Sequence, residues 1–185
     1  MSDVKDQIKK EFKALKSNFL VLLDTHAENY FEAVMEIAGL MSEEKTGVYV
    51  TASRPYRFIS SEMQRRNINT DNILFLDCIS AMAGEHSSGN EKCIFVENPA
   101  ALEEISMHIN SLTSRIKSDE KFLIMDSVST LLIYNSTNSV KEFSMFLINK
   151  MRLEGLNGML VIIEKEAPED LKQILIAMCD KTIYV

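Results

Sequence analysis

The chain has few of the residues that mark several specialised protein classes. Among 185 residues it has three cysteines, three prolines, six glycines and no tryptophan. Cys78, Cys93 and Cys179 are odd in number and form no C-x-x-C pair, which argues against a disulfide framework or a zinc site and favours reduced thiols in the cytoplasm. So few prolines and glycines also leave no flexible linker that would divide the chain into several domains.

Long apolar runs and an excess of positive charge are missing as well. No uninterrupted apolar run approaches the roughly 18 residues that a membrane span needs, and the N-terminus has no apolar signal region. The formal net charge is -7 with a pI of about 5.1, so the chain as a whole repels polyanions. We therefore expect a cytoplasmic protein without membrane contact, for which nucleic acid is an unlikely partner.

The composition that remains is that of a globular protein. Hydrophobic residues make up 46% of the chain, and 185 residues fit one hydrophobic core. Val4, Ile8, Phe12 and Leu15 recur three or four residues apart, which predicts an amphipathic helix in residues 1–17. Residues 18–185 are then expected to form one α/β domain.

Apolar strand-like runs alternate with helical patterns along the rest of the chain. This order predicts βαβ crossovers and hence a mainly parallel sheet with helices on both faces, with any ligand at the carboxyl ends of the strands. The segment 79–91 is rich in Ser, Gly, Ala and Asn and predicts a surface loop. Expected strands cover 18–23, 47–51, 72–77, 93–96, 122–125, 159–163 and 182–185; expected helices cover 30–41, 58–66, 99–117, 140–153 and 169–178.

Asp126 is the strongest local signal for chemistry, because it ends an apolar strand at this edge of the sheet. In P-loop ATPases such an aspartate orders Mg²⁺, while a G-x-x-x-x-G-K-[ST] loop after the first strand cradles the phosphates. The stretch of that length here, DTHAENYF at 24–31, has Asp24, Asn29 and Tyr30 where the two glycines and the lysine belong. Without the lysine, and with Asp24 and Glu28 nearby, Mg·ATP binding at this loop is improbable.

Two longer stretches carry a resemblance to a known family. The run LIMDSVSTLL at 123–132, followed by FSMFLINKMRLEGLNGMLVIIEKE at 143–166, resembles the KaiC-like branch of the RecA superfamily, including its archaeal single-domain members. The resemblance covers residues 18–185 and implies a three-layer RecA-like fold. The family's acidic residue after the second strand, which activates water, is absent from Ala52-Ser-Arg-Pro55, so we expect no catalytic residues, no cofactor and no hydrolysis.

The remaining candidates each allow a functional and an ordinary interpretation. Ser127 and Ser129 lack a nucleophile elbow and are expected at a turn and helix start. An edge cluster of acids and one histidine could bind a divalent cation, or could consist of solvated loop acids and a remnant Asp126 held by backbone N–H groups. The cluster comprises Asp24, His26, Glu28, Asp77, Asp126 and Glu164.

The arginines and methionines also allow either a functional or an ordinary structural interpretation. Arg54, Arg57, Arg65 and Arg66 could meet an acidic surface or a phosphate, or form a solvated helix face. Five methionines are expected on apolar helix faces, where they serve core packing or an adaptable interface. They are Met35, Met41, Met145, Met151 and Met178.

The sequence therefore favours a non-catalytic RecA/KaiC-like domain that acts through protein association in a regulatory or signalling role. The partner would be a second copy or an active relative, and the apolar face of the N-terminal helix is one candidate contact surface. The alternative is a sensor that binds a nucleotide or small ligand at the carboxyl edge of the sheet without efficient hydrolysis. Nucleic-acid binding is a third hypothesis, which needs a basic stripe around Arg54–Arg66.

Overall fold

A seven-stranded sheet forms the centre of the protein. The computed structural model describes residues 2–85 and 90–185, except for the side chains of residues 2 and 3. The strand order is β4-β3-β2-β5-β6-β1-β7, and every pairing is parallel, as predicted for most of the sheet. The strands are β1 (Leu20–Thr25), β2 (Thr46–Thr51), β3 (Ile73–Asp77), β4 (Cys93–Phe95), β5 (Lys121–Asp126), β6 (Asn157–Ile163) and β7 (Lys181–Tyr184).

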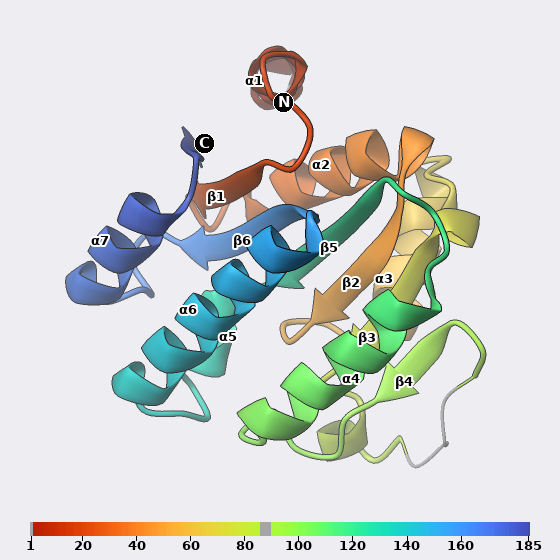
Figure 1. Ribbon diagram of the computed structural model, residues 1–185, viewed down its shortest axis with the longest axis vertical. Coiled ribbons are helices and arrows are strands. Elements are labelled where there is room, and N and C mark those ends of the chain that lie inside the picture. The colour runs from red at the N-terminus through yellow and green to blue at the C-terminus, as the bar shows by residue number, and fades with distance from the viewer. Residues whose placement is uncertain (1, 86–89) are drawn as a thin grey trace.

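Helices cover both faces of this sheet, so the three-layer α/β prediction is confirmed (Figure 1). One face is covered by α1 (Ser2–Lys13), α2 (Tyr30–Glu44) and α3 (Tyr56–Arg65), and the other by α4 (Leu102–Arg115), α5 (Val128–Leu131), α6 (Thr137–Glu154) and α7 (Glu169–Met178). Two short 3₁₀ turns, η1 (Thr70–Asn72) and η2 (Ala81–Ala83), flank β3. The predicted loop at 79–91 contains η2, and its residues 86–89 lie outside the described part of the chain.

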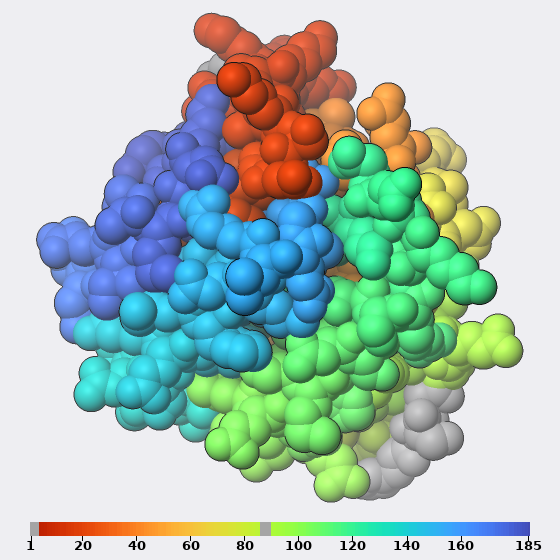
Figure 2. All heavy atoms as spheres, in the orientation of Figure 1, coloured from red at the N-terminus to blue at the C-terminus, as the bar shows by residue number. Residues whose placement is uncertain are grey.

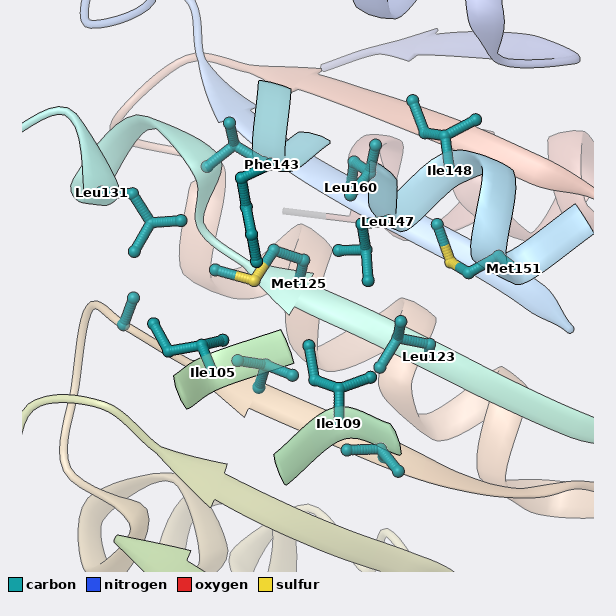
Figure 3. Packing of buried hydrophobic residues seen from close by; sticks show 14 of the residues in the cluster. Ile105, Ile109, Leu123, Met125, Leu131, Phe143, Leu147, Ile148, Met151 and Leu160 are labelled. Carbon is teal, nitrogen blue, oxygen red and sulfur yellow. The ribbon is translucent and has the colours of Figure 1, made fainter. Parts of the chain in front are cut away.

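The core consists of two apolar layers, one on each side of the sheet. All of β1 and most of β2 and β5 are buried. The sequences of these strands are therefore mostly continuous apolar runs, without the alternation of apolar and polar residues that a half-exposed strand shows. On the α4/α6 side, Leu123 and Met125 of β5 lie between Ile109 of α4 and Leu147 of α6 (Figure 3). This packing fixes the strand ends, and hence the loops that carry the candidate residues.

Local sequence determines where several elements begin and end. Ser136 accepts the backbone N–H of Ser139 at the start of α6, and Gly155 ends that helix at φ 64°. The helix predicted from Pro99 begins later, at Leu102, because the Asn98 side chain accepts the N–H of Ala100 and holds a turn before it.

The apolar face of α1 is packed against α2 and the sheet. Ile8 is fully buried, and Val4, Phe12 and Leu15 lie against the same apolar layer. Lys5 adds ion pairs to Glu32 and Glu36 of α2, at 2.9 and 3.8 Å. The expectation that this face is available to a partner is therefore wrong, whereas the domain boundary at residue 17 stays a prediction.

The sulfur-containing side chains mostly lie where the sequence predicts them. All three cysteines are free, with Cys78 and Cys93 buried and Cys179 half-buried. Of the five helical methionines, Met35, Met41 and Met151 are buried and Met178 packs against the core, but Met145 is 40% exposed.

Within the described residues no helix combines the length and apolar character that crossing a membrane requires.

Candidate functional site

Asp126 lies at the end of β5, near the middle of the sheet, and its side chain is completely buried. Tyr30, the first residue of α2, donates its hydroxyl to one carboxylate oxygen of Asp126, and Tyr49 of β2 donates to the other. The Ser53 hydroxyl lies 2.7 Å from the Tyr30 hydroxyl and 3.4 Å from Asp126 Oδ1. Asp126 is therefore held by phenol groups, and not by the backbone N–H groups that we expected.

Burial dominates the electrostatics of this cluster. It raises the pKa of Asp126, an effect that the hydrogen bonds from Tyr30 and Tyr49 and the charge of Arg54 oppose. Burial also raises the pKa of both tyrosines, and the adjacent Asp126 carboxylate adds to the effect. Both phenols therefore remain protonated donors at neutral pH, and the Asp126 side chain that they contact is buried.

Arg54, in the loop after β2, covers the start of α2. Its guanidinium carbon lies 4.2 Å from the ring centre of Phe31 and 5.5 Å from those of Tyr30 and Phe58. These distances are typical of cation–π contacts. The N-terminal end of α2 is thus covered by an arginine that belongs to the chain itself.

The loop between β1 and α2 uses three of its backbone N–H groups in hydrogen bonds within the protein. The N–H groups of Asn29 and Tyr30 both donate to the carbonyl of His26 at 3.0 Å, and the N–H of His26 donates to the carbonyl of Val185 at 2.7 Å. A phosphate-binding loop instead turns successive N–H groups towards the anion. In this conformation, residues 26, 29 and 30 offer no such donors.

Asp24, the last acid of β1 before this loop, is engaged by α7. Its Oδ2 lies 2.7 Å from Nζ of Lys172, and its Oδ1 is buried without a hydrogen-bond partner among the described residues. The hydrogen bond to Asp24 raises the pKa of Lys172. Asp24 therefore ties β1 to α7 and stabilises the packing of that helix.

A depression of about 400 Å³ beside the same loop is lined by three glutamates, one histidine, one lysine and two apolar residues. Glu28, Glu164 and Glu166 line it together with His26 and Lys165, and Nδ1 of His26 lies 2.9 Å from Oε2 of Glu164. Three carboxylates against one lysine favour a negative potential, which repels a polyphosphate.

The proposed cation cluster is not assembled. Asp77 accepts the backbone N–H groups of Tyr56, Ile79 and Ser80 at 2.7–2.9 Å, while Asp126 and Asp24 are engaged as described above. Among the described residues no group of three histidines, cysteines or acids is placed to hold a metal ion. The solvated-acid interpretation fits Glu28 and Glu164 but is wrong for Asp24 and Asp77, which are buried.

The two serines after Asp126 have the structural roles predicted for them. Ser127 Oγ accepts the N–H of Thr130 at the start of α5, and Ser129 Oγ accepts the N–H of Ile163 at the end of β6. Ser127 therefore caps α5, and Ser129 links that helix to the neighbouring strand.

The arginine cluster is largely neutralised by its neighbours. Arg57 pairs with Glu85 at 2.9 Å and Arg66 with Glu32 at 2.8 Å, and Arg65 pairs with an acid of its own helix. Such paired arginines do not form the basic stripe that nucleic-acid binding requires.

Comparison with solved structures identifies the fold, although no protein-family model and no curated protein sequence matches the chain. A KaiC-like protein, PH0186, from Pyrococcus horikoshii superimposes with a TM-score of 0.65 at 16% identity, over 92% of this chain and 72% of that one. The flagellar accessory protein FlaH from Methanocaldococcus jannaschii gives 0.63 at 12% identity, over 98% and 76%. The chain has a RecA/KaiC-like fold.

A third similar structure was solved with a bound peptide. PH0321 from Pyrococcus horikoshii, solved in complex with an unknown peptide, gives a TM-score of 0.64 at 10% identity, over 97% of this chain and 82% of that one. Identities of 10–16% establish the RecA/KaiC-like fold alone.

Within the RecA/KaiC-like fold, the structure brings together only part of the predicted site. Tyr30 and Asp126 are in direct contact, whereas Asp24 pairs with α7 and Asn29 lies in the loop before α2. Sequence reasoning missed Tyr49, the second donor to Asp126. The sequence does give one signal for this contact. Tyr49 lies within the apolar strand GVYVT, and the hydroxyl of a buried tyrosine usually has a hydrogen-bond partner, here on the adjacent strand β5.

Proposed function

We propose that this RecA/KaiC-like domain neither binds Mg·ATP nor hydrolyses it, and that it acts by associating with another protein. The observation that carries the proposal is the enclosure of Asp126: a fully buried carboxylate whose two oxygens each accept a tyrosine hydroxyl. A magnesium ion and its waters need oxygen ligands that are open on one side. Reaching Asp126 would require displacement of Tyr30 from the start of α2.

Two further features support the loss of nucleotide binding. The β1–α2 loop uses the N–H groups of Asn29 and Tyr30 in its own turn, and the adjacent depression is lined by three glutamates. Tyr30 stands where the motif has its lysine, so the positive charge that would contact the β- and γ-phosphates is missing. These features support our proposal of a degenerate, pseudo-ATPase form of the fold: the lysine is absent, N–H groups of the loop are engaged within the protein, and Asp126 is enclosed.

The fold itself, which matches solved structures over 92–98% of the chain, supports a role in association. One similar solved protein, PH0321, was captured with an unknown peptide. We propose that this domain likewise binds a polypeptide, in a regulatory or signalling complex with a second copy or with an active relative. No catalytic residue and no cofactor enters this proposal.

A thermal-shift titration tests the absence of nucleotide binding. The purified chain is titrated with Mg·ATP, ADP and cyclic dinucleotides to millimolar concentration, beside a P-loop ATPase with an intact loop as a positive control. Because a ligand that binds only the folded state raises the melting temperature by mass action, we expect a shift for the control and none for this chain.

A saturable shift with the wild-type chain would contradict the proposal. If Asp126→Asn then abolished the shift while circular dichroism showed a folded protein, the carboxyl edge would be a ligand-sensing site. Equilibrium dialysis with labelled ATP gives a second readout that does not depend on melting.

A further inference from the structure

The helical face opposite α1 and α2 contains a groove between α4 and α6, with a volume of about 770 Å³. Its walls are the first two turns of α4 and the first half of α6, which lie side by side over the sheet (Figure 1). The same two helices form the face turned towards the viewer in Figure 2. Nothing in the candidate site described above involves this face.

Large apolar side chains are exposed along the groove. Met107 of α4 is 69% exposed and Phe146 of α6 is 48% exposed, although both lie on helices whose other faces form the core. Leu102 and Phe143 also line the groove and join it to the apolar layer beneath. Burial of apolar surface is favourable, and these two side chains leave part of theirs in water, so the pair marks a surface suited to a partner.

The charges around the groove have one sign. Glu103, Glu104 and Glu142 line it, and no lysine or arginine is among its lining residues. Glu104 lies 3.6 Å from Nε2 of His108 on its own helix, and the acids of α2 are compensated by cations, since Glu32 pairs with both Lys5 and Arg66. A ligand that brings positive charge to Glu103 and Glu142 therefore complements this groove.

We propose that the α4–α6 groove binds a basic amphipathic helix from a protein partner. A third helix fits between two adjacent helices by packing its ridges into their groove, and its apolar residues at i, i+3, i+4 and i+7 would meet Met107 and Phe146. The flexible methionine side chain adapts to such anchors, and lysines or arginines flanking them would pair with the glutamates. This inference rests on the proposed function and names the surface and the chemistry of the partner.

Binding of two synthetic peptides to the full chain tests the proposal. Both peptides carry leucine at i, i+3, i+4 and i+7 and a fluorescent label; one has lysine at the remaining positions and the other glutamate. We expect saturable binding of the lysine peptide by anisotropy, a weaker interaction at high salt, and no binding of the glutamate peptide. Equal binding of both peptides, or of neither, would overturn the proposal.

Variants localise the interaction to the groove. Phe146→Ala and Met107→Ala should each weaken binding of the lysine peptide at least about fivefold, as truncated anchors do in other interfaces. Leu153→Ala is the matched control, because Leu153 lies on the same helix, is 89% exposed and does not line the groove. If all three variants bind alike, the peptide binds elsewhere and the proposal is wrong.

Methionine methyl signals give a local readout that does not depend on affinity. With ¹³C-methyl methionine labelling, the lysine peptide should shift the Met107 signal and leave that of Met82, which is 55% exposed in η2, unchanged.

Sedimentation of the free chain tests whether a second copy of the chain occupies the groove instead. A dimer that Phe146→Ala dissociates would assign the groove to that second copy and overturn the proposal. Failure of the peptide leaves the nucleotide result intact, so the two proposals fail separately.

Discussion

At the scale of single residues, three aspartates at the carboxyl edge of the sheet make internal contacts. Asp126 accepts two phenols, Asp77 accepts three backbone N–H groups, and Asp24 pairs with Lys172. Each carboxylate is almost or completely buried, so each depends on these partners to offset its desolvation. Removing a partner should therefore reduce the free energy of unfolding.

Tyr49→Phe removes the hydroxyl that donates to Asp126 Oδ2 and keeps the ring in the apolar layer. We expect the free energy of unfolding to fall by about 1–3 kcal/mol, because a buried acceptor loses its partner. Urea denaturation measures the change, with Tyr184→Phe as the control, since Tyr184 is 57% exposed. A loss no greater than that of the control would show that this hydrogen bond contributes little.

The buried Asp126 also predicts a pH dependence. Its folded-state pKa is raised, mainly by burial, above the unfolded value of about 3.9. Between these two pKa values the folded chain keeps a proton that the unfolded chain has lost, so stability is complete below pH 3.9 and decreases as pH rises through this window. Tyr30, Tyr49 and Arg54 are the ionisable groups that face Asp126.

Asp126→Asn removes this titration and should change the pH profile. The free energy of unfolding of the wild-type chain should fall relative to the variant from about pH 4 upward, by at most about 1.4 kcal/mol per pH unit. Urea denaturation at several pH values measures both curves, and the exposed Asp119→Asn serves as a control that should run parallel to the wild type. Parallel curves for all three proteins would mean that Asp126 does not titrate in this way.

At the scale of elements, close packing between neighbours decides which positions tolerate change. Gly47 of β2 lies against Phe122 of β5, where an added Cβ would be 2.4 Å from the Phe122 carbonyl oxygen and as close to its ring. Gly39 of α2 has room, since its added Cβ would meet only side-chain atoms of Ile68, at 3.5 and 3.6 Å. The strand pair therefore needs a glycine that the helix does not.

The two glycines should respond in opposite directions to alanine. Gly47→Ala should destabilise the chain by at least about 1–3 kcal/mol, because backbone atoms have to move apart. Gly39→Ala should stabilise it by roughly 0.5–1 kcal/mol, because alanine restricts the unfolded chain and favours the helix. Denaturant titration measures both variants. Stabilisation by Gly47→Ala would contradict the packing described for β2 and β5, and destabilisation by Gly39→Ala would contradict the room described beside Ile68.

The first helix gives a second prediction at this scale. Ile8 is fully buried against the α2 side of the core, so Ile8→Ala should cost about 2–5 kcal/mol in the free energy of docking of α1. Amide hydrogen exchange should show faster exchange in α1 first, with Leu153→Ala on the exposed face of α6 as the control. Unchanged exchange in α1 would show that this helix is not held by its apolar face.

At the scale of the whole molecule, the surface charge determines whether the protein can bind nucleic acid. The chain carries a formal net charge of -7, and Arg57, Arg65 and Arg66 each pair with a glutamate. Nonspecific nucleic-acid binding depends on unpaired lysines and arginines that release counterions from phosphates. The surface described here does not offer such a stripe around α3.

We accordingly expect no saturable binding of single-stranded or duplex DNA at low salt, where electrostatic attraction is strongest. Fluorescence anisotropy with labelled oligonucleotides measures this, and a basic DNA-binding protein provides the positive control. Dissociation constants of about 10⁻⁶–10⁻⁴ M, the usual nonspecific range, would contradict the expectation. Loss of that binding in Arg57→Ala would then locate it at α3.

The sequence by itself determined the sheet, its parallel direction and the positions of most elements. Apolar runs such as FLIM at 122–125 are readable because a strand buried on both faces has no polar residues to interrupt it. It also determined what the β1–α2 loop lacks, since a phosphate-binding motif is defined by residues that are contiguous in the chain.

Only the tertiary structure decided how the remaining groups are used. Tyr49 and Tyr30 reach Asp126 from 77 and 96 residues away, and no local pattern records contacts between such distant positions. Packing likewise placed the apolar face of α1 in the core and left Met107 and Phe146 exposed, although an amphipathic pattern does not say which apolar side chains find a neighbour. The physical reason is that burial and charge pairing depend on which elements meet, and the fold alone brings them together.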